Sequence, residues 1–318
     1  MSRFTRTTVR TRALTALVAA ALALVALAGC AAPAEKPAAE KSAPVAATFP
    51  VTITDDASRT VTIKTEPKRI VSLAPANTEI AFALGLGDRV VGVTTYDDYP
   101  ADVTKITKIG DFTTPNIEAI AAAKPDLILA TTGVQADVLA KLEALGATVI
   151  AIDPQNLAGV YMAIERVGTA TGTSTKAAAL VDGMKVDVDD IVKSVEATGV
   201  VTAFVEIAQN PLYTAGTGTL IDELVTLAGG KNVVTQPGWV AYSAEQVVKD
   251  DPAVYLATKG SMSDPAQLAQ RAGFKGLSAV KNGRVVILDD NLVSRPGPRV
   301  VLGLGEIAAA LHPELVSK

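Results

Sequence analysis

Cysteine is nearly absent from this 318-residue chain, in which Cys30 is the only one. With a single cysteine no intrachain disulfide can form, so a folded body must be held together by a buried core. Apolar residues make up 49% of the sequence, which is enough for one or two domains of that kind.

Histidine and enzyme motifs are equally scarce. The one histidine, His312, lies next to Pro313 near the C-terminus, where we expect a surface or helix-end position. A site for a bare transition metal is disfavoured, because only oxygen ligands remain. No zinc-protease motif, nucleophile elbow or phosphate loop occurs, and we interpret the glycines of "AGTGTL" (215–220) as a flexible turn. The sequence therefore predicts no catalytic residue, no resident cofactor and no metal site.

Positive charge is also in short supply. The 29 lysines and arginines are outnumbered by 33 acids, which gives a formal net charge of −4. Arg3, Arg6, Arg10 and Arg12 lie in a segment that we expect to be removed, so the mature chain is more acidic still. Nucleic acid is excluded as a partner, because its recognition requires a basic face.

The N-terminus has the pattern of an export signal. After the basic residues, Ala13–Ala28 is apolar but shorter than the roughly 20 residues of a membrane-spanning helix. It ends in Leu-Ala-Gly-Cys, which resembles a lipobox. We predict a lipoprotein signal peptide over 1–29, lipidation of Cys30 and a flexible Ala/Pro/Glu/Lys tether over 30–48. The protein would then be exported and anchored by lipid to the outer face of the cell membrane, on the periplasmic side where an outer membrane exists. The alternative is an ordinary signal peptide with an incidental cysteine.

Short apolar strands alternate with helical patterns through the rest of the chain. A hairpin is expected over 51–63, where alternation surrounds Asp55-Asp56-Ala57-Ser58. Later strands are expected at 69–73, 89–93, 127–131, 148–152, 202–207, 253–258 and 284–288. Strands separated by helices predict an α/β fold with mainly parallel sheets.

One uninterrupted helical pattern, Ser174–Ala197, divides the chain into halves. Such a helix would span about 36 Å, which suits a strut between two lobes, although a packed helix of one large domain is the alternative. We predict two related α/β lobes, N-terminal over 49–170 and C-terminal over 200–318, joined by a bridging segment at 171–199. Ligands of open α/β sheets bind at the carboxyl ends of the strands, so we expect a ligand cleft between the lobes.

The two halves share a repeated pattern. "EAIAAAKPDLILATTG" begins at Glu118 and "EQVVKDDPAVYLATKG" begins at Glu245, with Glu, Pro, Leu-Ala-Thr and Gly at the same spacing. An acid in the first turn of a helix complements the helix dipole by about 0.3–1 kcal/mol, so each glutamate alone needs no function. Their equivalence in two lobes suggests a matched pair that docks on two equivalent basic sites of one partner.

Aromatic residues are few, yet they gather in loops. The chain has one Trp, six Tyr and six Phe, and six of these follow predicted strands in Gly-, Pro-, Asp- or Thr-rich segments: Tyr96, Tyr99, Phe112, Tyr213, Trp239 and Tyr242. Together they predict an aromatic-lined site. Arg295 and Arg299, in "SRPGPR", would meet acidic groups of a ligand, or instead form ion pairs with Asp289 or Asp290.

Four stretches carry a family resemblance: "RIVSLAPANTEIAFALG", "YDDYP", "NIEAIAAAKPDLILA" and "GWVAYSAEQV". They resemble the substrate-binding proteins of cobalamin and ferric-siderophore ABC importers, from about Pro67 to the C-terminus. The resemblance implies two α/β lobes bridged by one long helix. It also implies docking of Glu118 and Glu245 on a permease dimer with its ATPase, and ligand contacts from Tyr96, Phe112, Tyr213, Trp239 and Arg295.

Two positions depart from the cobalamin-binding members of that family. Phe112 stands where they have tryptophan, and Thr131-Thr132 replace another aromatic, which thins the aromatic wall.

We predict a monomeric, lipid-anchored importer component that captures a metal chelate. A corrinoid is the first candidate for that chelate. A ferric-siderophore receptor, or a haem receptor with Tyr96 or Tyr213 as axial ligand, is the alternative in the same class. Other classes are an exported enzyme using Asp97, Asp98 and Arg295, and an adhesion module without a cleft.

Overall fold

The structure is a computed structural model of the chain, and it describes residues 48–315 except 145 and 263. The expected signal peptide (1–29), Cys30 and all of the expected tether but its last residue lie outside the described residues. Among the residues described, no helix is both long and apolar enough to cross a bilayer.

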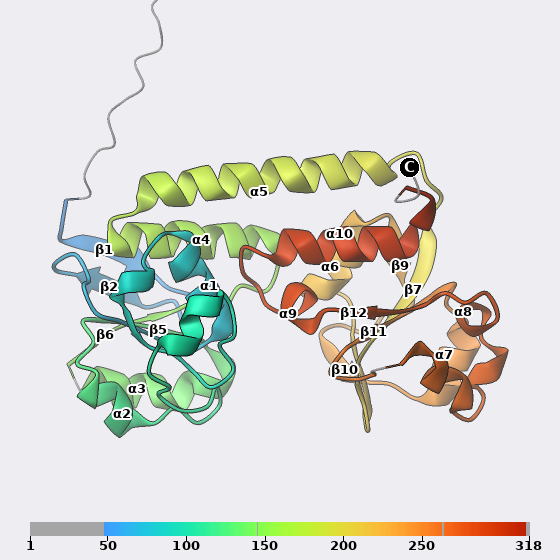
Figure 1. The fold of residues 1–318 in the computed structure, drawn as a ribbon, viewed down its shortest axis with the longest axis horizontal. Helices are drawn as coiled ribbons and strands as arrows, with labels where there is room; N and C mark the ends of the chain where they lie inside the picture. Colours follow the sequence, from blue (N-terminus) through green and yellow to red (C-terminus); the bar gives the residue numbers. More distant parts are fainter. Residues whose placement is uncertain (1–47, 145, 263, 316–318) are drawn as a thin grey trace, which may run out of the picture. The chain divides into compact units, whose positions relative to one another are not determined.

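The N-terminal lobe (N-lobe) is built on a four-stranded parallel sheet of order β4-β3-β5-β6 (Figure 1). Its strands are β3 (Ile70–Ser72), β4 (Val90–Gly92), β5 (Leu127–Ala130) and β6 (Thr148–Ala151), and its helices are α1 (Pro75–Ala83), α2 (Ile117–Ala122) and α3 (Ala136–Ala144). All four residues of β5 are apolar and buried, as is typical of a parallel strand covered on both faces. The expected hairpin is present as β1 (Val51–Thr54) and β2 (Thr60–Ile63).

The C-terminal lobe (C-lobe) carries a six-stranded mixed sheet of order β10-β8-β7-β11-β12, with β9 also paired to β7. Its strands are β7 (Val201–Gln209), β8 (Leu212–Ala215), β9 (Gly230–Asn232), β10 (Trp239–Ala241), β11 (Val254–Thr258) and β12 (Val285–Leu288). Its helices are α6 (Leu220–Leu227), α7 (Ala244–Asp250), α8 (Ser278–Lys281) and α9 (Asp290–Val293). Strands β8 and β10, which the sequence pattern did not indicate, pair antiparallel.

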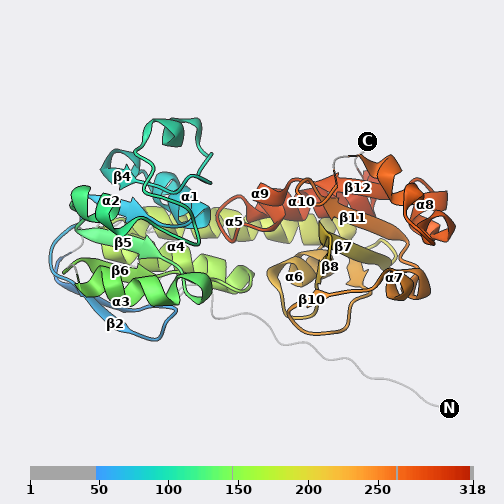
Figure 2. The same ribbon diagram turned by 90° about the horizontal axis from the view of Figure 1, so that it is seen from below.

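Three helices form a layer that both lobes share: α4 (Leu157–Thr171), α5 (Ser174–Val195) and α10 (Val300–Leu311). In Figure 1, α5 runs along α4 and then along α10, and Figure 2 shows the two groups of strands separate beneath it. The expected bridging helix is thus confirmed, ending at Val195. Its buried residues recur at helical spacing, because only one stripe faces α4 and α10.

The remaining described helices are short 3₁₀ turns at Gly87–Arg89, Ala101–Lys105, Gly133–Gln135, Pro265–Gln270, Phe274–Gly276 and Pro313–Leu315. His312 caps the C-terminal end of α10, as the helix-end expectation had it, but it is buried at 2% exposure and not on the surface. Its imidazole Nε2 lies 3.3 Å from the Thr198 hydroxyl, at the end of α5.

The largest hydrophobic core is continuous across the two lobes. It contains Leu129 of the N-lobe sheet, Val181 of α5, Val205 of the C-lobe sheet and Leu304 of α10. Two smaller clusters lie on the outer faces of the two sheets, one around Ile128 in the N-lobe and one around Phe204 in the C-lobe. The shared core fixes the lobes against α5 and leaves the carboxyl ends of the N-lobe strands facing the loops of the C-lobe.

Candidate functional site

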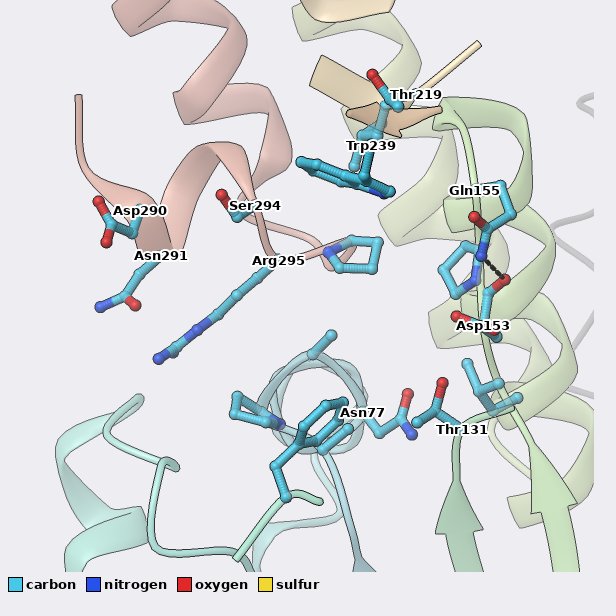
Figure 3. A pocket seen from close by; sticks show the side chains of 18 of the residues that line it. Asn77, Thr131, Asp153, Gln155, Thr219, Trp239, Asp290, Asn291, Ser294 and Arg295 are labelled. Carbon is cyan, nitrogen blue, oxygen red and sulfur yellow. Dashed lines mark hydrogen bonds between the residues drawn. The ribbon is translucent and has the colours of Figure 1, made fainter. Parts of the chain in front are cut away.

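A cavity of about 620 Å³ lies between the two lobes. Figure 3 shows polar and aromatic side chains converging on it from both lobes. The lining residues that bear functional side chains are Asn77, Tyr96, Phe112, Thr113, Thr131, Asp153, Gln155, Thr219, Trp239, Asp290, Asn291, Ser294 and Arg295. A cavity of this volume suits an organic ligand or a chelate and is far larger than a bare ion needs.

The N-lobe wall is made by residues that directly follow its parallel strands. Asn77 lies in the first turns of α1, after β3, and its side-chain amide donates to the Ala130 carbonyl at 3.0 Å. Thr131 follows β5, and Asp153 follows β6 and accepts a hydrogen bond from the Thr132 hydroxyl. The strand ends meet at one edge of the sheet, which brings these residues together.

A buried glutamine holds this wall in place. Gln135 has no exposed surface, and its side-chain amide donates to the carbonyls of Leu73 and Phe112, both at 2.7 Å. Its carbonyl accepts from the Thr131 backbone N–H at 3.0 Å. Gln135 therefore ties the end of β3, the end of β5 and the loop bearing Phe112 into one unit.

The C-lobe wall presents the only tryptophan of the chain. Trp239 begins β10, lines the cavity and remains 46% exposed. The loop before it is fastened to the 215–220 loop: Gly216 N–H donates to the Gly238 carbonyl at 2.8 Å, and Gly238 N–H to the Thr217 carbonyl at 3.0 Å. A β-carbon at Gly216 would lie 1.9 Å from the Gln236 carbonyl oxygen, so the segment expected to be a flexible turn is a tightly held support for Trp239.

The six loop aromatics divide into two groups. Tyr96, Phe112 and Trp239 line the cavity, and Tyr96 is 57% exposed. Tyr213, Tyr99 and Tyr242 do not line it. The Tyr213 hydroxyl donates to the Trp239 carbonyl at 3.2 Å, the Tyr99 ring lies under the Arg299 guanidinium, and the Tyr242 hydroxyl donates to Asp250.

Arg295 and Arg299 reach across to the N-lobe. Arg295 donates to Asp98 at 2.6 Å and to Glu79 at 3.2 Å, while Arg299 donates twice to Glu79, at 2.9 and 2.6 Å. The expectation of ion pairs with Asp289 or Asp290 is wrong. Asp289 pairs with Lys259 instead, and Asp290 accepts from the Gly260 N–H, since both arginines extend to acids of the N-lobe.

The two neighbouring carboxylates in "YDDYP", Asp97 and Asp98, have pKa values shifted in opposite directions. Burial alone would raise the pKa of Asp98, but the Arg295 guanidinium outweighs it and holds that pKa below its usual value. Burial dominates at Asp97 and raises its pKa. Asp97 does not line the cavity; one of its oxygens accepts from the Thr94 backbone and hydroxyl. Asp97, which the enzyme hypothesis names, therefore lies outside the cavity.

The two repeated glutamates occupy equivalent places. Glu118 lies in the first turn of α2, capped by Asn116, and Glu245 lies in the first turn of α7, capped by Ser243. Both are exposed. Each helix is followed by a residue with positive φ directly before proline, Lys124 in one copy and Asp251 in the other, which confirms that the repeated sequence folds the same way twice.

Several lining residues were not singled out in the sequence. Asn77, Asp153, Gln155, Thr219, Asn291 and Ser294 are common polar residues in unremarkable contexts. A signal did exist for four of them, Asn77, Asp153, Gln155 and Asn291, since each follows a predicted strand within a few residues, where ligands of α/β sheets are bound.

Comparison with known proteins gives a consistent set of relatives. Residues 70–292 match the sequence model of a family described as periplasmic binding protein. The chain is 41% identical over 302 residues to YvrC of Bacillus subtilis, named an uncharacterized ABC transporter substrate-binding lipoprotein, and the match covers 92% of this chain and 95% of the relative. It is 30% identical over 307 residues to a cobalamin-binding protein of Halobacterium salinarum, covering 93% of this chain and 83% of the relative.

A solved structure agrees with these sequences. It is that of a possible iron-binding, periplasmic solute-binding protein from Staphylococcus epidermidis, which is 36% identical and superposes with a TM-score of 0.71. The match covers 78% of this chain and 100% of that one.

Proposed function

Because the chain belongs to the periplasmic binding protein family and is therefore a substrate-binding protein and not an enzyme, we propose that it captures a corrinoid and delivers it to an ABC importer. The protein acts as a monomer, held at the outer face of the membrane by lipid on Cys30. The lipobox-like sequence and the name of the Bacillus relative, a lipoprotein, support the anchor.

The chemical composition of the cavity lining supports the proposal of a corrinoid ligand. Three aromatic rings, from Tyr96, Phe112 and Trp239, provide flat apolar contact area. Amides and hydroxyls make most of the polar lining: Asn77, Gln155, Asn291, Thr113, Thr131, Thr219 and Ser294. A large planar ligand with many amide side groups satisfies both kinds of surface, because each amide offers a donor and an acceptor.

The charges on the lining favour the same ligand. Of the described residues that line the cavity, two are acids, Asp153 and Asp290, and one is basic, Arg295, which is already paired with Asp98 and Glu79. Haem carries two propionates, and many ferric siderophores are anionic. Both would require a free cation, because an unpaired carboxylate is poorly tolerated in a partly desolvated site.

Tryptophan fluorescence and calorimetry test the assignment directly. Cyanocobalamin should quench the emission of Trp239 saturably at one ligand per protein, because the indole forms part of the cavity wall. Calorimetry should give the same stoichiometry. Haemin and ferric enterobactin, both anionic and titrated in parallel, should bind at least about tenfold more weakly, a difference of about 1.4 kcal/mol.

Two variants separate ligand binding from the signal. Trp239→Phe should lose the fluorescence response and keep calorimetric binding at reduced affinity. Tyr96→Phe should leave cyanocobalamin binding nearly unchanged, whereas it would abolish haem coordination if Tyr96 were an axial ligand. The corrinoid assignment fails if cyanocobalamin changes neither fluorescence nor heat, or if haemin binds more tightly and Tyr96→Phe removes that binding.

We also propose that Glu118 and Glu245 dock the protein on a permease dimer with its ATPase. Both are exposed acids in the first turns of equivalent helices, one in each lobe. Hydrogen bonds from its own backbone N–H and from Ser243 hold the pKa of Glu245 below its usual value, so it presents a full negative charge at neutral pH. Two like charges on two related lobes are complementary to two equivalent basic sites on a dimer.

The docking proposal is tested with the permease in liposomes. Glu118→Ala combined with Glu245→Ala should abolish stimulation of the permease ATPase and leave corrinoid affinity intact. Asp137→Ala with Glu196→Ala removes the same charge from exposed positions on α3 and after α5, and should retain stimulation. Loss of ligand binding in the first variant, or equal loss of stimulation in both, would refute the assignment.

A further inference from the structure

Four charged side chains form a compact cluster at the junction of the lobes. The N-lobe supplies Glu79 and Asp98, and the C-lobe supplies Arg295 and Arg299. Two acids face two arginines, so the cluster is neutral as a whole. Only Arg295 also lines the ligand cavity, and in Figure 3 its side chain extends along one side of that cavity.

The two acids have different partners. Glu79 is almost fully buried and takes two hydrogen bonds from Arg299, at 2.9 and 2.6 Å, which satisfy both of its oxygens. Its contact with Arg295 is longer, at 3.2 Å. Glu79 and Arg299 are therefore a structural pair that joins the lobes, with the Tyr99 ring 4.0 Å from the Arg299 guanidinium on the outside.

Asp98 is the principal partner of Arg295. Its Oδ1 accepts from Arg295 at 2.6 Å, and its Oδ2 accepts from the Asn291 side-chain amide at 3.1 Å. The Arg295 guanidinium also lies 3.4 Å from the Tyr96 carbonyl oxygen. Asp98 does not line the cavity itself, and its side chain is 53% exposed. Asp98 therefore contacts Arg295 and Asn291, two lining residues of the C-lobe, from a position outside the cavity.

We propose that Asp98 is a specificity-determining residue that neutralises Arg295 and so makes the cavity select against ligands bearing carboxylates. This inference rests on the proposed corrinoid function and adds a determinant to it. With Asp98 in place, the only basic side chain among the described lining residues has its charge balanced from outside the cavity. Without that carboxylate, the guanidinium would be available to a ligand anion, and the junction would gain one positive charge.

A matched pair of ligands measures this selectivity. Cyanocobalamin and its monocarboxylic acid, in which one propionamide is hydrolysed to propionate, share size and shape and differ by one negative charge. The wild-type protein should prefer the amide. Asp98→Asn should shift the ratio of the two affinities toward the acid by about tenfold, because the Arg295 guanidinium, released from its closest carboxylate, can then pair directly with the propionate.

Three further variants isolate the cause. Asp102→Asn removes the same charge four positions away, from an exposed aspartate paired with Lys105, and should leave the ratio near that of the wild type. Asp98→Glu keeps the negative charge that Asp98→Asn removes, and it should keep the preference for the amide. In an Arg295→Gln background, Asp98→Asn should have no further effect on the ratio, because Asp98 acts through Arg295.

The outcomes separate this inference from the function on which it rests. If the wild-type protein binds neither corrinoid, the proposed function fails. If it binds the amide but Asp98→Asn shifts the ratio no more than Asp102→Asn does, the role of Asp98 is refuted and the corrinoid function stands. A shift that persists in the Arg295→Gln background also overturns the inference.

Discussion

One buried carboxylate in the C-lobe, that of Glu206, depends on two neighbouring donors. Glu206, on β7, has no exposed surface and accepts hydrogen bonds from Arg271 and from the Tyr255 hydroxyl. Burial and the Glu206 carboxylate together raise the pKa of Tyr255, which stays protonated and remains a donor. Both oxygens of Glu206 therefore have donors, which is the condition for a tolerable buried carboxylate.

Removing the arginine should therefore be severe. Arg271→Met leaves Glu206 as an uncompensated charge in the core and should lower the free energy of unfolding by about 3–5 kcal/mol, measured by urea denaturation. Glu206→Gln combined with Arg271→Met should recover most of that loss, because a neutral amide needs no counter-charge. An Arg271→Met variant as stable as the wild type would contradict this account.

The hairpin β1–β2 shows how one element is attached to a lobe. The Asp55 carboxylate accepts from the backbone N–H of Ala57 and Arg59, from the Arg59 guanidinium, and from the Ala151 N–H at 3.0 Å. The last bond joins the hairpin to β6. Burial alone would raise the pKa of Asp55, but these hydrogen bonds, with Arg59 foremost, hold it below the ordinary value of 3.8.

A depressed pKa in the folded state means that Asp55 stabilises the fold when ionised. That stability is fully present above the unfolded-state pKa and is lost as the pH falls through the lower folded-state pKa. Asp55→Asn should reduce the free energy of unfolding at pH 7 by about 1–3 kcal/mol, and the difference from the wild type should shrink as the pH falls below about 4. Urea denaturation from pH 7 to pH 3 measures both, with Asp137→Asn as an exposed control; a pH-independent difference would exclude the ionised carboxylate as the cause.

Strong periodicity made most elements predictable. The runs that became β5, β6, β11 and β12 are apolar and β-branched, and the pattern of α5 holds for six turns. Strands β8 and β10 escaped prediction, because they are short and lie among Gly, Pro and Thr residues. Their pairing fixes Trp239 opposite Ala215, a register that depends on contacts between distant segments.

The whole described body shares one continuous core. Residues of both sheets, α4, α5 and α10 belong to the same hydrophobic cluster, so neither lobe can lose its packing without exposing the other. Two sheets joined in this way should unfold together.

A destabilising substitution in one lobe should therefore shift the unfolding transition that is measured by a spectroscopic probe in the other lobe. Leu129→Ala, in the N-lobe core, should lower the free energy of unfolding by about 2–5 kcal/mol. The transition followed by Trp239 fluorescence in the C-lobe should move to lower urea by the same amount as the transition followed by circular dichroism. Lobes that unfold independently would leave the Trp239 transition in place.

The sequence by itself determined the class of the protein. Its alternating strand and helix pattern and its long helix follow from local spacing, and both are present in the structure. Tyr96, Phe112, Trp239 and Arg295 line the cavity, because loops after strands converge there, whereas Tyr213 does not line it.

Only the tertiary structure decided which partners those residues have. The sequence alone left open whether Arg295 contacts a ligand or pairs with Asp289. In the structure it pairs with Asp98 and Glu79 instead. The reason is physical: these acids lie about 200 positions away in the chain, and no local pattern reports an ion pair that forms only when two lobes are packed on a common core.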